Sequence, residues 1–146
     1  ELLFQLGHEH EIDGEVLDME ITPNRGDCLS LKGLARDLNY FYKAKELPKS
    51  DMEMPALDLQ FDNKAQELCP NISFMQIEIE KVPTKYEPYL ESYFVDLGIN
   101  KNNFFTDISN YLAYESGQPT HCFDQSTMQG HFSLAKKQLK TKFKTY

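Results

Sequence analysis

Apolar and polar side chains alternate along two short stretches of the chain, and a period of two is typical of β-strands with one buried face. The first stretch spans residues 15–21. The second spans residues 75–80, where Met75, Ile77 and Ile79 fall on one side and polar residues fall on the other. We therefore predict a strand in each stretch.

Three other stretches repeat apolar residues every three or four positions, the spacing that gives a helix one apolar face. They predict helices over residues 31–42, over residues 86–97 and from about residue 106 to residue 116. Gly98 and Gly117 follow the last two, and glycine suits the left-handed position just past a helix. Candidate N-terminal caps are Asp27 or Ser30 for the first helix and Thr106 or Asp107 for the third.

These elements predict an α+β fold in three parts. Residues 1–45 form the end of a small structural domain, a strand–loop–helix unit whose loop is residues 22–27. Residues 46–63 contain two prolines and no sustained period, so we interpret them as a linker. Residues 64–146 then contribute part of a mixed or antiparallel sheet with helices.

The chain is acidic, with 15 Lys and Arg residues against 23 Asp and Glu residues and a net charge of −8. It lacks the excess of basic residues that is typical of proteins that bind nucleic acid mainly through phosphate contacts. Something other than the net charge of this chain must therefore supply most of any affinity for nucleic acid. The exception is the end of the chain, where five lysines fall between residues 136 and 144. Such a cluster is usually a solvated strand or a frayed terminus, and the sequence leaves its role open.

The 146 residues contain no apolar run of about 18 residues, so the sequence predicts no membrane-spanning helix. The first residues lack a basic leader and a cleavage site, which favours a cytoplasmic protein. The cysteines, Cys28, Cys69 and Cys122, are odd in number and lack CxxC spacing. We therefore expect reduced, mostly buried thiols and no disulfide framework.

Common catalytic and phosphate-binding motifs such as GxGxxG, GxxxxGK[ST], HExxH and GxSxG do not occur. His8 and His10 are two positions apart and would share a face only on a strand, so they favour no zinc site. We predict no metal site and no cofactor in this chain.

The richest polar constellation lies around the third predicted helix. Ser109 and Asn110 fall in what we predict to be its first turn, where side chains and free backbone amides can face a ligand together. His121 lies in the polar loop that follows the helix, and that loop could fold back over them. A small polar pocket would result, although the same residues could instead be a cap, a loop anchor and a structural histidine.

Two long motifs of the chain are similar to those of one protein family. TPNRGDCLS at residues 22–30, followed by GLARDL at residues 33–38, resembles TPNRxDxLS and GxARELA. TDISNY at residues 106–111, followed by GQPTHCFD at residues 117–124, resembles VDxTNY and GQPxHAFD. The family is the beta subunit of bacterial phenylalanine–tRNA ligase. The resemblance runs from about Gly7 to Gly130 and is weak beyond it, where the remaining residues could form a divergent strand pair.

The resemblance implies a subunit of an aminoacyl-tRNA synthetase that works in protein synthesis. In this family an alpha subunit attaches phenylalanine to tRNA(Phe) with ATP and magnesium, within an alpha-2 beta-2 assembly. The central module of the beta subunit hydrolyses tyrosine that was attached by mistake. A second sieve of this kind is needed because a hydrophobic pocket rejects an isostere with one added hydroxyl by only about 10²-fold.

Carried over to this sequence, the resemblance assigns His121 to the editing pocket, near the terminal adenosine of the tRNA 3′ end and the ester. It assigns Ser109 and Asn110 to the same pocket wall, with Ser109 at a position where the family usually has threonine. The family glutamate that recognises the tyrosine hydroxyl has no counterpart before Tyr146. The chain therefore resembles a fragment that carries the start of the editing module, and we expect it to be inactive by itself.

Two alternatives remain at this level. A non-catalytic module of the same ancestry could hold subunits or tRNA without hydrolysis. A free-standing deacylase would share the second motif, but the motif at residues 22–30 belongs to the long beta subunit and disfavours it.

Overall fold

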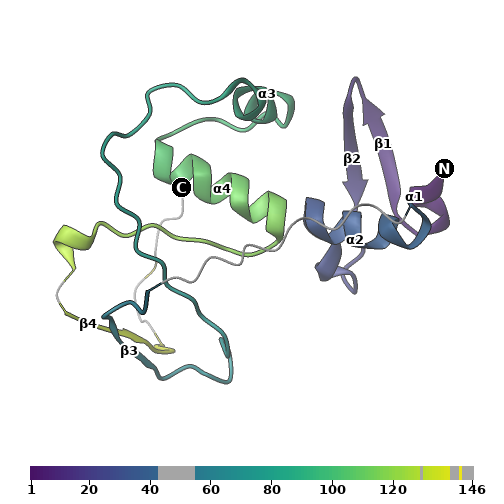
Figure 1. The fold of residues 1–146 in the computed structure, drawn as a ribbon. Coiled ribbons are helices and arrows are strands. Elements are labelled where there is room, and N and C mark those ends of the chain that lie inside the picture. The colour runs from purple at the N-terminus through teal and green to yellow at the C-terminus, as the bar shows by residue number, and fades with distance from the viewer. Residues whose placement is uncertain (43–54, 129, 139–141, 143–146) are drawn as a thin grey trace. The chain divides into compact units, whose positions relative to one another are not determined.

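The computed structural model describes residues 1–42, 55–128, 130–138 and 142 (Figure 1). The fold is α+β, as predicted, and packs as two compact units. The first comprises Glu1–Lys49 and Glu80–Phe123, and the second comprises Ser50–Ile79 and Asp124–Tyr146. These units group residues that lie close together in space, whereas the predicted domains are continuous stretches of sequence. The predicted domain boundaries therefore stay a prediction. The described elements are α1 (Leu2–Gln5), β1 (Glu9–Asp13), β2 (Val16–Glu20), η1 (Gly26–Cys28), α2 (Leu31–Tyr42), β3 (Gln60–Asn63), α3 (Pro88–Asp96), α4 (Phe104–Ser116), η2 (Gln125–Thr127) and β4 (His131–Leu134).

The first unit begins with an antiparallel hairpin. β2 confirms the strand predicted over residues 15–21, and it pairs with β1, which the sequence pattern did not predict. Asp13 faces Val16 across the turn, so the loop has only two residues. Gly14 takes a positive φ of 61°, and this conformation lets so short a turn close.

α2 confirms the helix predicted over residues 31–42. Ser30 is its cap, because the Ser30 Oγ accepts a hydrogen bond of 3.0 Å from the Gly33 backbone N–H. The loop before α2 ends in the short 3₁₀ turn η1, whose Cys28 is fully buried.

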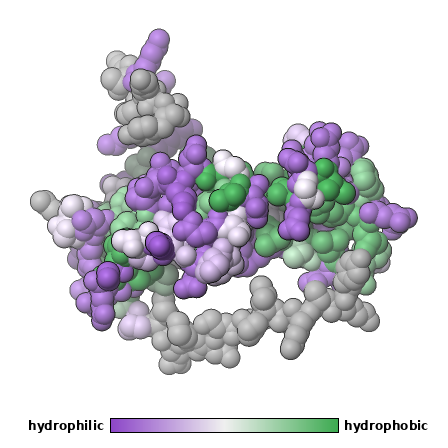
Figure 2. All heavy atoms as spheres, turned by 90° about the horizontal axis from the view of Figure 1, so that it is seen from above, coloured by the Kyte–Doolittle hydropathy of each residue, from purple (hydrophilic) through white to green (hydrophobic). Residues whose placement is uncertain are grey.

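α3 confirms the second predicted helix, and Gly98 just beyond it has a φ of 62°. Its inner face supplies Leu90 and Phe94, the largest part of a small apolar core in the described residues. Many other large apolar side chains stay exposed, and Figure 2 shows them in green on the surface among hydrophilic residues.

The second unit contains a two-stranded parallel sheet. β3 pairs with β4 in the register Gln60↔His131 to Asn63↔Leu134. β3 occupies the last four residues of the stretch that we interpreted as a linker, residues 46–63, while residues 46–54 of that stretch lie outside the described residues. β4 is one strand of the pair predicted beyond Gly130, and the rest of that pair also falls largely outside them.

The strand predicted over residues 75–80 is wrong. This stretch has no regular secondary structure, and Met75 and Ile77 are 61% and 63% exposed. Alternation makes a segment suited to a sheet, but a strand forms only where a partner supplies backbone hydrogen bonds. No described residue supplies such a ladder to this stretch.

Candidate functional site

The candidate site is built on α4, which begins earlier than the sequence predicted. Asn103 is its cap, and the Asn103 Oδ1 accepts a hydrogen bond of 3.1 Å from the Thr106 backbone N–H. The predicted caps Thr106 and Asp107 are therefore wrong, because an asparagine three residues upstream already satisfies the free amides. Ser109 consequently lies in the second turn and not in the first, where backbone amides would be free.

α4 ends at Gly117, whose φ of 75° turns the chain out of the helix. The loop that follows runs back alongside the helix (Figure 1). The Thr120 hydroxyl donates to the Ser109 carbonyl oxygen at 3.3 Å, and the Cys122 Sγ lies 3.6 Å from the Ser109 Oγ. The prediction that this loop folds back over α4 is confirmed.

The three predicted site residues differ in their surroundings. Ser109 and Asn110 are half-buried on α4, and Ser109 contacts the returning loop. His121 is exposed, and its ring packs against Phe123 with 4.6 Å between ring centroids. Within the described part of the chain, no hydrogen bond joins His121 to Ser109 or Asn110. Whether these three residues form a functional site stays a prediction.

The sequence analysis considered Asp107 only as a candidate cap and missed its role as an anchor of α4. This side chain is 1% exposed. It accepts a hydrogen bond of 2.6 Å from the Tyr86 hydroxyl and one of 2.8 Å from the Asn102 backbone N–H. The pKa of Tyr86 is raised to about 12, mainly by burial of the hydroxyl and to a smaller extent by its hydrogen bond to Asp107. Asp107 therefore ties the start of α4 to the segment before α3.

The other end of α4 packs against the start of α2. The Ser30 Cβ and Oγ lie 3.1 Å from the position that a Cβ on Gly117 would occupy. Lys32 and Glu115 approach to 3.9 Å across the same junction. A polar cavity of about 210 Å³ lies here, and its walls include Arg36 and Gln118. The strand–loop–helix unit thus supports the point from which the His121 loop departs.

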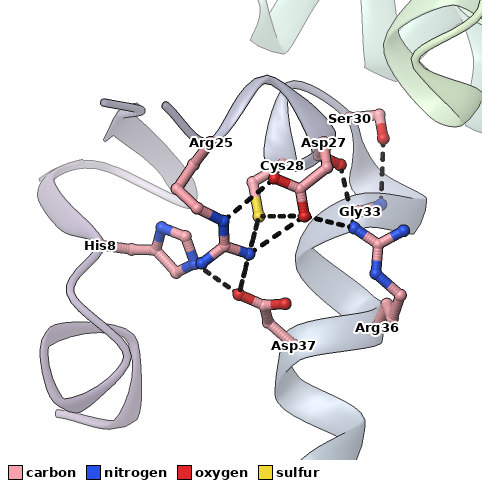
Figure 3. Close-up of polar contacts among 8 residues, drawn as sticks. All are labelled: His8, Arg25, Asp27, Cys28, Ser30, Gly33, Arg36 and Asp37. Atoms are coloured by element: carbon pink, nitrogen blue, oxygen red, sulfur yellow. Dashed lines mark hydrogen bonds and ion pairs between the residues drawn. The ribbon is translucent and has the colours of Figure 1, made fainter. Parts of the chain in front are cut away.

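A cluster of polar groups holds this strand–loop–helix unit together (Figure 3). The Arg25 guanidinium donates to the Asp37 carboxylate at 2.6 Å and to the Cys28 Sγ at 2.7 Å. It also pairs with Asp27 at 3.0 Å, while His8 contacts Asp37 at 3.1 Å. The sequence analysis considered His8 only as a metal ligand with His10, and it missed this ion-pair cluster.

His8, Cys28 and Asp37 bring potential metal-ligating atoms within 4.8 Å of one another. The Arg25 guanidinium already contacts two of these three groups. Its positive charge takes the place that a bound cation would take between the Asp37 carboxylate and the thiol. The geometry therefore fits an internal ion pair better than a metal site.

The ion-pair cluster gives the first unit a defined sensitivity to acid. Hydrogen bonds from Arg25 lower the pKa of Asp27 to about 2, and those from Arg25 and His8 also lower the pKa of Asp37. Because these pKa values fall below the ordinary value of 3.8, their stabilisation is present above about pH 4 and is lost as the pH falls toward 2.

We accordingly expect hydrogen exchange of the α2 amides to accelerate between pH 4 and pH 2, after correction for intrinsic exchange. In Arg25→Gln the carboxylates lose their shared donor, so this acid-dependent part of the acceleration should shrink. An equal acceleration in both proteins would show that the cluster does not stabilise α2.

Comparisons with known proteins identify the family to which the chain belongs. Residues 73–146 match the B3/4 domain family. The chain belongs to that family. It is also 32% identical to the phenylalanine–tRNA ligase beta subunit of Psychrobacter arcticus over 82% of this chain and 16% of that protein. The corresponding figures are 36%, 80% and 15% for the Aquifex aeolicus protein of the same name, and 33%, 88% and 17% for that of Thermotoga maritima.

The resemblance to phenylalanine–tRNA ligase beta subunits is thereby confirmed. The B3/4 match contains Ser109, Asn110 and His121. The beta-subunit matches cover at least 80% of the chain, more than the B3/4 match alone, so they extend into the residues before 73. The chain spans about one sixth of the length of these curated relatives. No helix in the described residues is long and apolar enough to cross a membrane.

Proposed function

We propose that this chain is part of a phenylalanine–tRNA ligase beta subunit and that its B3/4 region contributes to an editing site. The reaction is hydrolysis of tyrosyl-tRNA(Phe), the product of mistaken charging. The observation that carries this proposal is the contact between α4 and its returning loop. Thr120 and Cys122 lie against Ser109, so the loop segment that contains His121 runs beside the helix that carries Asn110.

Hydrolysis of this bond depends more on positioning the substrate and the attacking water than on a strong nucleophile. The bond between tyrosine and the terminal ribose is an activated ester. Water attacks its carbonyl carbon, the bond to the ribose oxygen breaks, and that oxygen takes up a proton as the terminal hydroxyl. Side chains that orient the ribose and the attacking water can supply much of the rate enhancement. Ser109, Asn110 and His121 offer a hydroxyl, an amide and an imidazole for this purpose.

The exposure of His121 also supports a large substrate. The tRNA 3′ end must reach the ester-binding groups from solvent, and an open loop admits it without rearrangement. The group that recognises the tyrosine hydroxyl is expected to come from outside this chain. As part of the same proposal, the alpha subunit is the partner that performs aminoacylation with ATP and magnesium.

The test is deacylation of tyrosyl-tRNA(Phe) by the full-length protein in its complex. We expect wild type to release tyrosine and to spare phenylalanyl-tRNA(Phe). His121→Ala or Asn110→Ala should slow release at least about tenfold, which corresponds to about 1.4 kcal/mol of transition-state stabilisation. Asn100→Ala, an exposed asparagine in the loop before α4, is the matched control and should leave the rate unchanged.

A wild-type protein that leaves tyrosyl-tRNA(Phe) intact would overturn the editing proposal. The non-catalytic module, which binds tRNA or a partner subunit without hydrolysis, would then be the better account. A rate that falls equally in Asn100→Ala would point to general loss of folding and would also speak against the assigned residues.

A further inference from the structure

The parallel pairing of β3 and β4 brings two lysines to one edge of the second unit. The carboxyl ends of parallel strands lie at the same edge of a sheet. Lys64 directly follows β3, and its backbone N–H donates to the Leu134 carbonyl oxygen at 2.8 Å. Lys136 follows the end of β4 by two residues. The two side chains therefore start from neighbouring strand ends.

A hollow of about 470 Å³ lies at this edge, and both lysines line it. Its other walls come from Asn63 and the turn over residues 65–68. Asn63 orders that turn, because its Oδ1 accepts from the Ala65 N–H at 3.0 Å and its Nδ2 donates to the Cys69 carbonyl at 2.8 Å. The hollow is thus a feature of an ordered turn between two strand ends.

The charges around the hollow favour an anion. Lys64 is paired with Asp62 at 3.3 Å, with both side chains about half exposed, and such exposed pairs are weak and exchange readily. Glu67 is the acidic side chain in the lining. Lys136 and the adjacent Lys137 are exposed. Asp124 is the last acidic residue of the sequence. The segment from β4 onward therefore carries lysines but no acidic residue, within a chain of net charge −8.

We propose that this hollow binds backbone phosphate of RNA, with Lys64 and Lys136 as its cationic groups. The inference rests on the proposed function, because the RNA in question is the tRNA substrate of the ligase. Lysine is a compact point charge without the planar fork that reads base edges, so the contact would position the RNA and not select a sequence. The two lysines would also provide a local positive site through which a chain of net negative charge can bind a polyanion.

Binding of uncharged tRNA(Phe) to the full-length protein in its complex tests this inference, measured by fluorescence anisotropy across a series of KCl concentrations. The double variant Lys64→Gln/Lys136→Gln should bind about tenfold more weakly near physiological salt. The negative slope of log K against log salt should become shallower by about 1.4–1.8, since each phosphate contact contributes about 0.7–0.9 to its magnitude. Lys64→Arg/Lys136→Arg keeps both charges and should retain binding.

The matched control is Lys81→Gln/Lys85→Gln, which removes the same charge from two exposed lysines of the first unit. An unchanged salt slope in Lys64→Gln/Lys136→Gln, or an equal loss in the control, would overturn the inference. Weakened assembly with the partner subunit at an unchanged RNA slope would also overturn it, in favour of a protein-binding surface.

The outcome is separable from that of the editing proposal. Uncharged tRNA has no ester, so its binding does not depend on hydrolysis. A shallower salt slope in Lys64→Gln/Lys136→Gln, together with a wild type that does not edit, would support the phosphate site and reject editing. An unchanged slope in a protein that edits would do the reverse.

Discussion

Replacing Gly33 by alanine is expected to destabilise α2 by about 2–3 kcal/mol, the upper part of the range of about 1–3 kcal/mol for inserting a methyl group where no space exists. A Cβ at this position would lie 2.0 Å from the Asp27 carbonyl oxygen and 2.9 Å from the Cys28 Cα. Both are backbone atoms, so a side-chain rotation cannot relieve the clash. The gain of about 1 kcal/mol that alanine normally brings to a helix interior would be outweighed.

Hydrogen exchange of the α2 amides measures this effect locally. Gly26→Ala is the matched control, because a Cβ at Gly26 meets no atom within 4 Å. It should change stability by no more than about 0.5 kcal/mol. Equal protection of α2 in Gly33→Ala and Gly26→Ala would show that the close approach of the loop to α2 is not needed for stability.

The consequence of Gly33→Ala should extend beyond α2. Ser30 caps α2 through the Gly33 N–H and also packs against the Gly117 position, where the His121 loop leaves α4. A backbone shift at residue 33 therefore moves the support of that loop. This connection gives the first sequence motif a physical role in the candidate site that lies in the second motif.

Local patterns were sufficient for elements whose partners lie nearby. β2 and α2 were predicted because each shows one clear period, and each packs within the same short unit. The fold-back of the loop after α4 was also predictable, since Gly117 can reverse the chain and polar residues follow it. These predictions needed only the geometry of single elements and turns.

Partners that are distant in sequence were beyond such patterns. The pairing of β3 with β4 joins segments far apart along the chain, and nothing in four residues of β3 specifies it. The alternation at residues 75–80 gave a wrong strand for the same reason, since suitability for a sheet does not provide a neighbour. The ion pairs of Arg25 with Asp37 likewise depend on how α2 packs against its preceding loop.

Asp107 shows how a residue in the candidate site motif can have a structural role that its sequence position hides. An acidic residue near a helix start suggests a cap on the solvent side. The buried carboxylate instead accepts hydrogen bonds from a side chain and a backbone amide outside the helix. Its charge also lies in the first turn of α4, where the helix dipole favours an anion.

Replacing Asp107 by alanine is therefore expected to destabilise the first unit by about 3–4 kcal/mol. The Tyr86 hydroxyl and the Asn102 N–H, which are both partly buried, would lose their acceptor, and a donor left unpaired away from water costs about 1–3 kcal/mol. Asp107→Asn keeps one acceptor oxygen but presents an amide N–H₂ to the other donor, so we expect an intermediate loss. Exchange of the α4 amides under native conditions reports the free-energy change.

Asp96→Ala is the control for this series. Asp96 is an exposed carboxylate at the end of α3, and its removal should change stability by no more than about 0.5 kcal/mol. Titration of the tyrosine absorbance provides a second measure. The pKa of Tyr86, about 12 in wild type, should fall in Asp107→Ala because the carboxylate no longer disfavours the phenolate. If α4 kept its protection and Tyr86 its titration, the buried hydrogen bonds of Asp107 would not be what anchors the helix that carries Ser109 and Asn110.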